Sequence, residues 1–174
     1  MYIGTPAAAE NDDAAVVVRH YSDELVPCSS ISRQLICIAA YLNELRTQSH
    51  LIHLNYEGEN FLPIHQFFKD QYEAHQEQFD AVGEYVRSMD FWMPMCSEGL
   101  KEALPCFHHI KSHSGRDMLT VYYQNLDDLV TLIEESEPVA TELRALDVAN
   151  YMAELMGAIN KAAWFIKATL RNCA

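Results

Sequence analysis

Apolar residues recur every three or four positions in two long stretches of the first half of the chain, and this period predicts amphipathic α-helices. The first stretch covers residues 31–55, with apolar positions at Leu35, Ile38, Ala39, Leu42, Leu45 and Ile52. The second stretch covers residues 60–89, with apolar positions at Phe68, Tyr72, Phe79, Val82 and Val86. Gly58 falls between them and predicts a turn, and Pro63 is tolerated in the first turn of the second helix.

A third long helix is predicted over residues 116–137. Ser114 and Asp117 resemble an N-terminal capping pair, in which a hydroxyl accepts a hydrogen bond from a backbone N–H of the first turn. Pro138 is expected to end or kink this helix, because proline lacks the N–H that an interior helical position donates. A short helix is predicted at residues 97–104, in the connection that precedes the third long helix.

A fourth long helix is predicted over residues 148–170, with Asp147 as its N-cap. Four long helices and no convincing strand predict an all-α four-helix bundle, with a short extra helix between the second and third long helices. Residues 1–22 are small, acidic and aperiodic, so we expect a flexible acidic N-terminal tail, followed by a single bundle domain over residues 23–174.

Length and composition agree with one soluble domain, since the chain has 174 residues, of which 49% are hydrophobic and 21% charged. The formal net charge is −13 and no basic patch offsets it, so DNA binding is not expected, whereas an acidic surface attracts metal cations.

The cysteines and the hydropathy indicate a cytoplasmic protein. Five widely spaced cysteines without a CxxC pair argue against a disulfide framework and for reduced thiols. No signal peptide and no run of about 18 apolar residues is present, so no contact with a membrane is expected.

Two histidines and two carboxylates are candidate metal ligands. His53 and His65 lie on either side of the predicted turn, and Asp80 and Glu84 are four residues apart, which places both carboxylates on one face of the second helix. Imidazole nitrogen and carboxylate oxygen together suit iron in both of its common oxidation states. The spacing alone also allows a simpler interpretation, with structural histidines and a solvated acidic face.

The stretch "HLNYEGENFLPIHQFF…FDAVGE" resembles the core motif of the Dps mini-ferritins. The matching residues are His53, Asn55, Gly58, Asn60, Phe61, His65, Asp80 and Glu84. The segment "NKAAWFIKATL", with Trp164, is similar to the last helix of that family, and the similarity extends over residues 35–170.

This resemblance implies a ferritin-like bundle that assembles into a hollow dodecamer. Dps proteins oxidise iron(II), typically with hydrogen peroxide, and store ferric iron inside the shell, which protects against oxidative damage. By the same resemblance, the metal site lies at a dimer interface, with His53 and His65 from one subunit and Asp80 and Glu84 from its partner. Iron is the expected metal, and zinc is expected to bind in vitro.

Lys69 departs from the family pattern, because an Asp or Glu usually stands four residues after the second histidine. Three interpretations remain open. Lys69 swings out to solvent and the four ligands still bind iron, or it forms an ion pair with Asp80 or Glu84 and closes the site. In the third, Glu73 or His75 helps to rebuild the site. The expected function is therefore iron oxidation and storage by a ferroxidase. The alternative is a shell protein with a degraded ferroxidase centre that acts as a non-enzymatic metal-binding or structural cage.

A second group of candidate ligands lies in the predicted loop before the third long helix. Its members are Cys106, His108, His109 and His113. Thiolate and imidazole suit zinc or copper, while surface side chains without a metal are the simpler interpretation.

Overall fold

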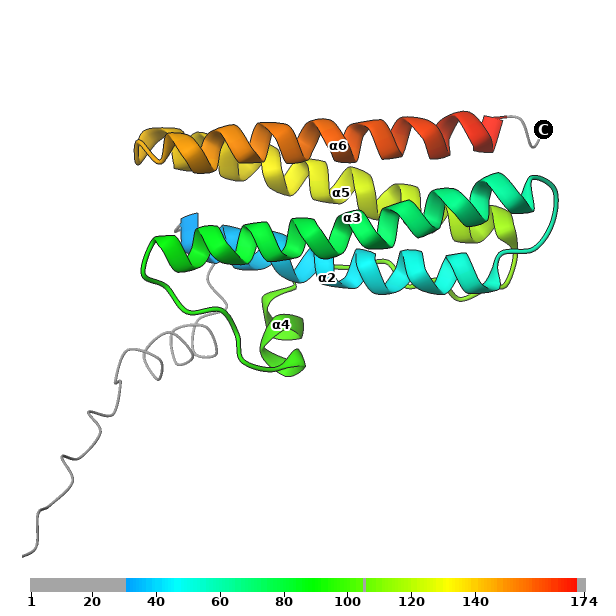
Figure 1. The fold of residues 1–174 in the computed structure, drawn as a ribbon, viewed down its shortest axis with the longest axis horizontal. Coiled ribbons are helices and arrows are strands. Elements are labelled where there is room, and N and C mark those ends of the chain that lie inside the picture. Colours follow the sequence, from blue (N-terminus) through cyan, green and yellow to red (C-terminus); the bar gives the residue numbers. More distant parts are fainter. Residues whose placement is uncertain (1–30, 105, 172–174) are drawn as a thin grey trace, which may run out of the picture.

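Four long helices and one short helix make up the part of the chain that the computed structural model describes, residues 31–104 and 106–171 (Figure 1). They are α2 (Ile31–Asn55), α3 (Phe61–Ser88), α4 (Ser97–Ala103), α5 (Gly115–Glu142) and α6 (Leu146–Arg171). These residues contain no strand. The predicted all-α bundle, with a short helix between the second and third long helices, is therefore confirmed. The predicted acidic tail, residues 1–22, lies outside the described residues.

The long helices form two antiparallel pairs that pack against each other (Figure 1). Helix α2 packs along α3, and α5 packs along α6, while α2 also contacts α5 and α3 contacts α6. The connection between α3 and α5 runs from one end of the bundle to the other, so α3 and α5 point the same way. One long crossover of this kind is typical of ferritin-like bundles. Helix α4 lies within that crossover and contacts α2.

The core is built from the apolar faces that the period predicts. In α2, all six positions of the predicted apolar stripe are fully buried, and Phe68, Val82 and Val86 of α3 are buried as well. Burying such side chains is the main favourable contribution to folding, at about 1.5–3 kcal/mol for each large apolar side chain. In the described part of the chain, no helix is long and apolar enough to cross a membrane.

Two predicted helix ends differ from the structure. Helix α5 does not end at Pro138 but continues to Glu142. Ser136 and Ala140, on either side of the proline, are both fully buried, so packing of this last turn against the bundle outweighs the lost hydrogen bond. Asp147 is not an N-cap, because α6 already begins at Leu146 and Asp147 lies in its first turn.

The predicted capping pair at the start of α5 is confirmed. Ser114 is the N-cap, and its hydroxyl accepts a hydrogen bond from the backbone N–H of Asp117 at 3.4 Å. This contact fixes where the crossover ends and α5 begins, which in turn sets the position of the loop over residues 106–114.

Candidate metal centre

The turn between α2 and α3 places two histidines face to face. His53 is in the last turn of α2, and His65 follows in the second turn of α3. Gly58 has a φ of 127°, a conformation that only glycine adopts without strain, and Asn60 has a left-handed φ of 61°. The hydroxyl of Tyr56 donates a hydrogen bond to the backbone oxygen of Glu59 at 3.0 Å, which closes the turn.

His53 and His65 hold each other through two reciprocal hydrogen bonds. Nδ1 of His53 lies 2.8 Å from the backbone oxygen of His65, and Nδ1 of His65 lies 2.9 Å from the backbone oxygen of His53. The two rings are stacked, with centroids 3.7 Å apart. A carbonyl oxygen only accepts, so both Nδ1 atoms carry the proton, and each neutral ring keeps its lone pair on Nε2. Metal-binding histidines are commonly oriented through such a bond from the second ring nitrogen.

Further aromatic rings fix the histidine pair in place. Phe61 stacks on His65 with ring centroids 5.1 Å apart, and Tyr72 meets His53 edge-on at 5.5 Å. His50 lies against the other side of this group, 4.4 Å from the ring of Tyr72. The spacing of residues in the sequence does not reveal these contacts, because three of the rings come from α3 and two from α2.

The two carboxylates lie far from the histidines of the same chain. Asp80 and Glu84 are exposed on one face of α3, beside a hollow that Met93 and Pro94 also line. Fifteen residues separate His65 from Asp80 on this helix, which corresponds to roughly 22 Å along its axis. Over residues 31–104 and 106–171, no three His, Cys, Asp or Glu side chains lie close enough together to hold a metal ion. One chain by itself therefore does not bring the four predicted ligands together.

Lys69 forms an ion pair with a neighbouring residue on its own helix. Its Nζ lies 2.8 Å from a carboxylate oxygen of Glu73, and both side chains are about half exposed. This hydrogen bond and the charge of Glu73 raise the pKa of Lys69 above its ordinary value. Asp80 is eleven residues from Lys69, or roughly 16 Å along α3, so an ion pair between them would have to form between two chains.

His75 does not belong to the surface around Lys69. It is 1% exposed, and its two ring nitrogens bond to Gln78 and Tyr122 inside the bundle. The third interpretation of the lysine therefore loses His75, and Glu73 is already occupied by Lys69.

Within the described residues, the bundle core offers no group of side chains that could hold a metal ion. Ferritin-like proteins with a metal centre inside the bundle use several inward-facing glutamates and histidines. Among the residues that the structure describes, the buried polar side chains are Ser32, Gln34, Gln48, Ser49, His75, Asn125 and Ser136. None of these is a carboxylate, so a centre with His53 and His65 has to lie at the surface of the bundle.

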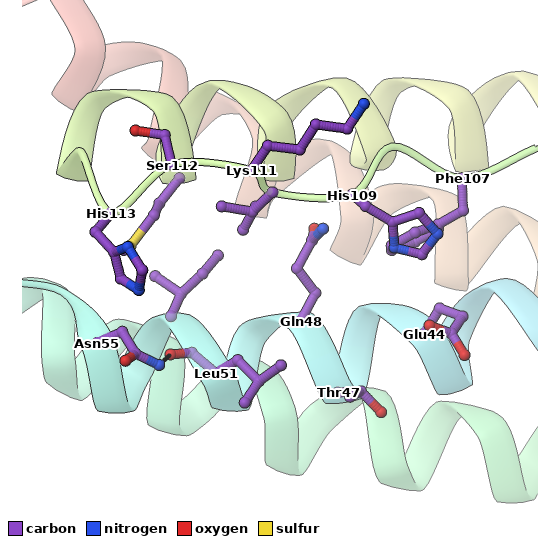
Figure 2. A pocket seen from close by; sticks show the side chains of 13 residues that line it. Glu44, Thr47, Gln48, Leu51, Asn55, Phe107, His109, Lys111, Ser112 and His113 are labelled. Carbon is purple, nitrogen blue, oxygen red and sulfur yellow. Dashed lines mark hydrogen bonds between the residues drawn. The ribbon is translucent and has the colours of Figure 1, made fainter.

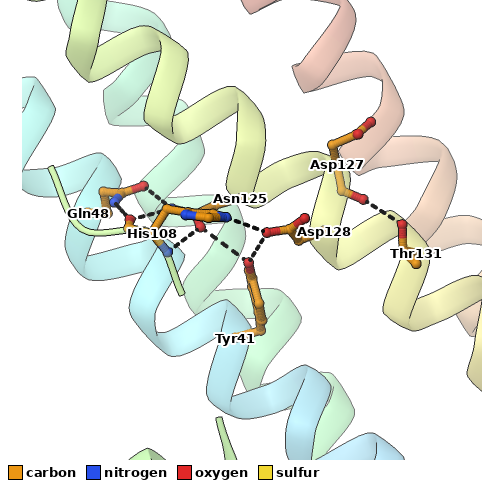
Figure 3. A network of polar contacts seen from close by, with 7 residues as sticks. All are labelled: Tyr41, Gln48, His108, Asn125, Asp127, Asp128 and Thr131. Atoms are coloured by element: carbon orange, nitrogen blue, oxygen red, sulfur yellow. Dashed lines mark hydrogen bonds and ion pairs between the residues drawn. The ribbon is translucent and has the colours of Figure 1, made fainter. Parts of the chain in front are cut away.

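In the described part of the crossover loop, residues 106–114, the cysteine and the histidines do not form a group that could hold a metal ion. His108 pairs with Asp128 at 3.2 Å, within a polar network that also joins Tyr41 and Asn125 (Figure 3). Figure 2 shows His109 and His113 at opposite ends of a groove of about 370 Å³ between α2 and the loop.

Comparison with known proteins agrees with this architecture. A model of the ferritin-like domain matches residues 35–174. The chain belongs to the ferritin-like family. No protein of curated function matches its sequence.

Solved structures place this ferritin-like chain among the Dps folds. Dps from Listeria monocytogenes superposes with a TM-score of 0.76 at 19% identity, over 81% of this chain and 93% of that one. Dps from Bacillus brevis gives 0.76 at 21% identity, over 80% and 94%. Antigen TpF1 from Treponema pallidum gives 0.74 at 17% identity, over 96% and 99%. The predicted resemblance to Dps is thus confirmed, and at these identities the likeness establishes the fold.

Proposed function

We propose that this ferritin-like protein is a Dps-like mini-ferritin of the cytoplasm, which oxidises iron(II), with hydrogen peroxide as the oxidant, and stores ferric iron in a hollow dodecameric shell. The observation that carries this proposal is the reciprocal pair of hydrogen bonds between His53 and His65. It fixes both rings with Nε2 as the remaining donor to a metal, which a histidine pair with a purely structural role does not require.

The proposed centre joins His53 and His65 of one subunit to Asp80 and Glu84 of its dimer partner. Two observations support it. Among the residues that the structure describes, no third His, Cys, Asp or Glu completes a metal site with the two histidines, and the exposed Asp80 lies roughly 22 Å from His65 along α3. Two solved structures of Listeria innocua Dps carry histidine-to-glycine substitutions at positions twelve residues apart, the same separation as His53 and His65, and another was soaked with cobalt.

Each residue of the centre has a separate role. The imidazoles hold iron(II), for which nitrogen donors are suitable, and the carboxylates hold the ion after oxidation, when oxygen donors are preferred. Two iron(II) ions each give up one electron, and one molecule of peroxide takes both electrons and two protons to form water. The protein supplies the position of the ions and the negative charge that stabilises the ferric product.

Lys69 decides between this function and a non-enzymatic shell. Its ion pair with Glu73 favours the first of the three interpretations, in which the lysine is held away from the ligands. In the alternative, the ammonium reaches the partner's carboxylates in the assembled shell and takes the place of the metal. Lys69→Asp distinguishes the two, because it should leave oxidation nearly unchanged in the first case and raise it sharply in the second.

The direct test loads the purified assembly with iron(II) without oxygen, adds peroxide and follows the absorbance of ferric iron. We expect rapid oxidation above a protein-free control, and a fall by about tenfold or more in His53→Ala and Asp80→Asn. The controls are His109→Ala and Glu77→Gln, which replace an exposed histidine of the crossover loop and an exposed carboxylate of α3. A wild-type rate equal to that of the protein-free control would exclude the ferroxidase and leave the non-enzymatic shell.

A further inference from the structure

A buried tyrosine and histidine form a hydrogen-bonded pair inside the bundle, away from the proposed metal centre. The hydroxyl of Tyr122 on α5 lies 2.8 Å from Nε2 of His75 on α3. Tyr122 is 0% exposed and His75 is 1% exposed. Phe68 packs edge-on against Tyr122 with ring centroids 4.9 Å apart, so the phenol is surrounded by apolar side chains.

The hydrogen bonds determine where the protons lie. Nδ1 of His75 is 2.8 Å from the amide oxygen Oε1 of Gln78, which only accepts, so Nδ1 carries the proton. In the neutral ring, Nε2 then has a lone pair and accepts the hydrogen bond that the Tyr122 hydroxyl donates. Burial lowers the pKa of His75 to about 4 and raises that of Tyr122 above its ordinary value, so both groups are neutral near pH 7.

A neutral phenol bonded to a neutral imidazole is an arrangement suited to one-electron chemistry. Loss of an electron makes the phenol proton strongly acidic, and in an apolar interior the charged radical cation is very costly unless a base takes that proton. We propose that Tyr122 and His75 are a redox-active pair, in which a one-electron oxidant removes an electron from Tyr122 while its hydroxyl proton moves to Nε2 of His75. The products are a neutral tyrosyl radical and an imidazolium. A thiolate that gives up one electron, and so becomes a thiyl radical, restores the pair as the proton returns from Nε2 to the phenol oxygen.

The other buried tyrosines are less suited to this reaction. Tyr56 donates its hydroxyl to the backbone oxygen of Glu59, which is a very weak base. Tyr41 donates to Asn125 and to Asp128, at 3.2 and 3.3 Å, and Asp128 already shares its charge with His108. Tyr122 combines full burial with a short bond to an imidazole.

The Tyr122–His75 pair lies close enough to the proposed metal centre to exchange an electron with an oxidant that forms there. His75 follows His65 by ten residues on α3, which is roughly 15 Å along the helix axis. An electron can tunnel through packed protein over such a distance. The natural oxidant is the hydroxyl radical, which forms together with hydroxide when a single iron(II) ion gives one electron to peroxide outside the paired reaction; its identity rests on the proposed function. The redox activity of the pair does not.

The test generates the oxidant with light, from a ruthenium trisbipyridine complex and persulfate, in the metal-free full-length assembly. Samples are frozen after a flash, and the radical is recorded by electron paramagnetic resonance. We expect a tyrosyl signal that narrows with ring-deuterated tyrosine. It should fall at least fivefold in Tyr122→Phe and His75→Gln, and stay unchanged in the matched control Tyr56→Phe. Circular dichroism and assembly size check that each variant folds.

If a core variant fails to fold, the proposal can still be tested on the wild-type protein, through the hydrogen bond that the tyrosyl radical accepts. The radical on Tyr122 should accept a hydrogen bond from the new N–H of His75, which appears as a coupling to a proton that exchanges in deuterium oxide. An equal radical yield in Tyr122→Phe or His75→Gln, or a tyrosyl signal without that exchangeable coupling, would overturn the proposal. Because no iron is present, failure of the ferroxidase would leave this result unaffected.

Discussion

His75 links the stability of the fold to pH through a single buried side chain. Its pKa is about 4 in the folded protein, because burial penalises the imidazolium, against about 6.5 in an unfolded chain. Between these values the unfolded chain binds more protons, so the free energy of unfolding falls as the pH drops from about 6.5 to about 4. The shift corresponds to a loss of about 3 kcal/mol over this window, and to none above it.

The measurement is urea denaturation of wild type and His75→Gln at several pH values between 7 and 4. Glutamine does not titrate, so the variant should be less stable at pH 7 but should lose about 3 kcal/mol less on acidification. His50→Gln removes an exposed histidine and should keep the wild-type dependence on pH. If His75→Gln and wild type lose stability in parallel, His75 is not the group that titrates.

The sequence was sufficient to single out His53 and His65 as a candidate pair, whose rings the structure brings together, but not to predict the hydrogen bond between His75 and Tyr122. The two histidines are recognisable because the turn, its glycine and their spacing form one motif. His75 was a candidate, beside Glu73, for a residue that helps to rebuild the site around Lys69. Its burial depends on Tyr122, which is 47 residues later in the chain, and no local pattern reveals such a contact.

At the scale of elements, Asn125 fastens the crossover loop to two helices (Figure 3). Its amide oxygen accepts from the backbone N–H of His108 at 2.9 Å and from the hydroxyl of Tyr41 at 3.2 Å. Its amide nitrogen donates to the backbone oxygen of His108 at 2.8 Å and to Gln48 at 3.0 Å. One fully buried side chain on α5 thus joins the loop, α2 and α5.

Asn125→Leu should therefore destabilise the fold more than an ordinary polar substitution. Leucine keeps a similar volume but removes all four hydrogen bonds of Asn125, including the one that the backbone N–H of His108 donates, at a cost of about 3 kcal/mol. Urea denaturation measures this loss, and hydrogen exchange of residues 106–114 should become faster. Asn43→Ala, which removes a partly exposed amide on α2, should change stability by less than about 0.5 kcal/mol. Equal effects of the two variants would contradict a fastening role.

The helices were largely predictable, while the connections between them were not. The apolar period fixes α2, α3 and the body of α5, because one face of each helix must be buried. In the sequence, Asn125 is only a weak helix former in the middle of α5. Its connecting role was not predictable, because its four hydrogen bonds go to residues of other segments. Pro138 was expected by a local rule to end or kink α5, and the helix continues past it because Ala140 is buried in the next turn.

At the scale of the whole molecule, the proposed centre predicts what fraction of metal sites is intact in assemblies mixed from two variants. In a two-fold dimer, each of the two sites takes its histidines from one subunit and its carboxylates from the other. A dimer of one His53→Ala and one Asp80→Asn subunit then has one site with both defects and one intact site. Random mixing of equal amounts makes half of the dimers mixed, so about a quarter of all sites should be intact.

The experiment is co-refolding of the two variants, followed by the iron oxidation assay, with each variant alone as the baseline. Oxidation should recover to about a quarter of the wild-type rate. The matched control mixes His53→Ala with His65→Ala, which damages the same half of the centre in both subunits and should restore nothing. A centre built within one chain predicts no recovery in either mixture, because every chain then carries a defect. Recovery in the first mixture alone therefore requires a site that two subunits complete, and it makes assembly a condition for activity.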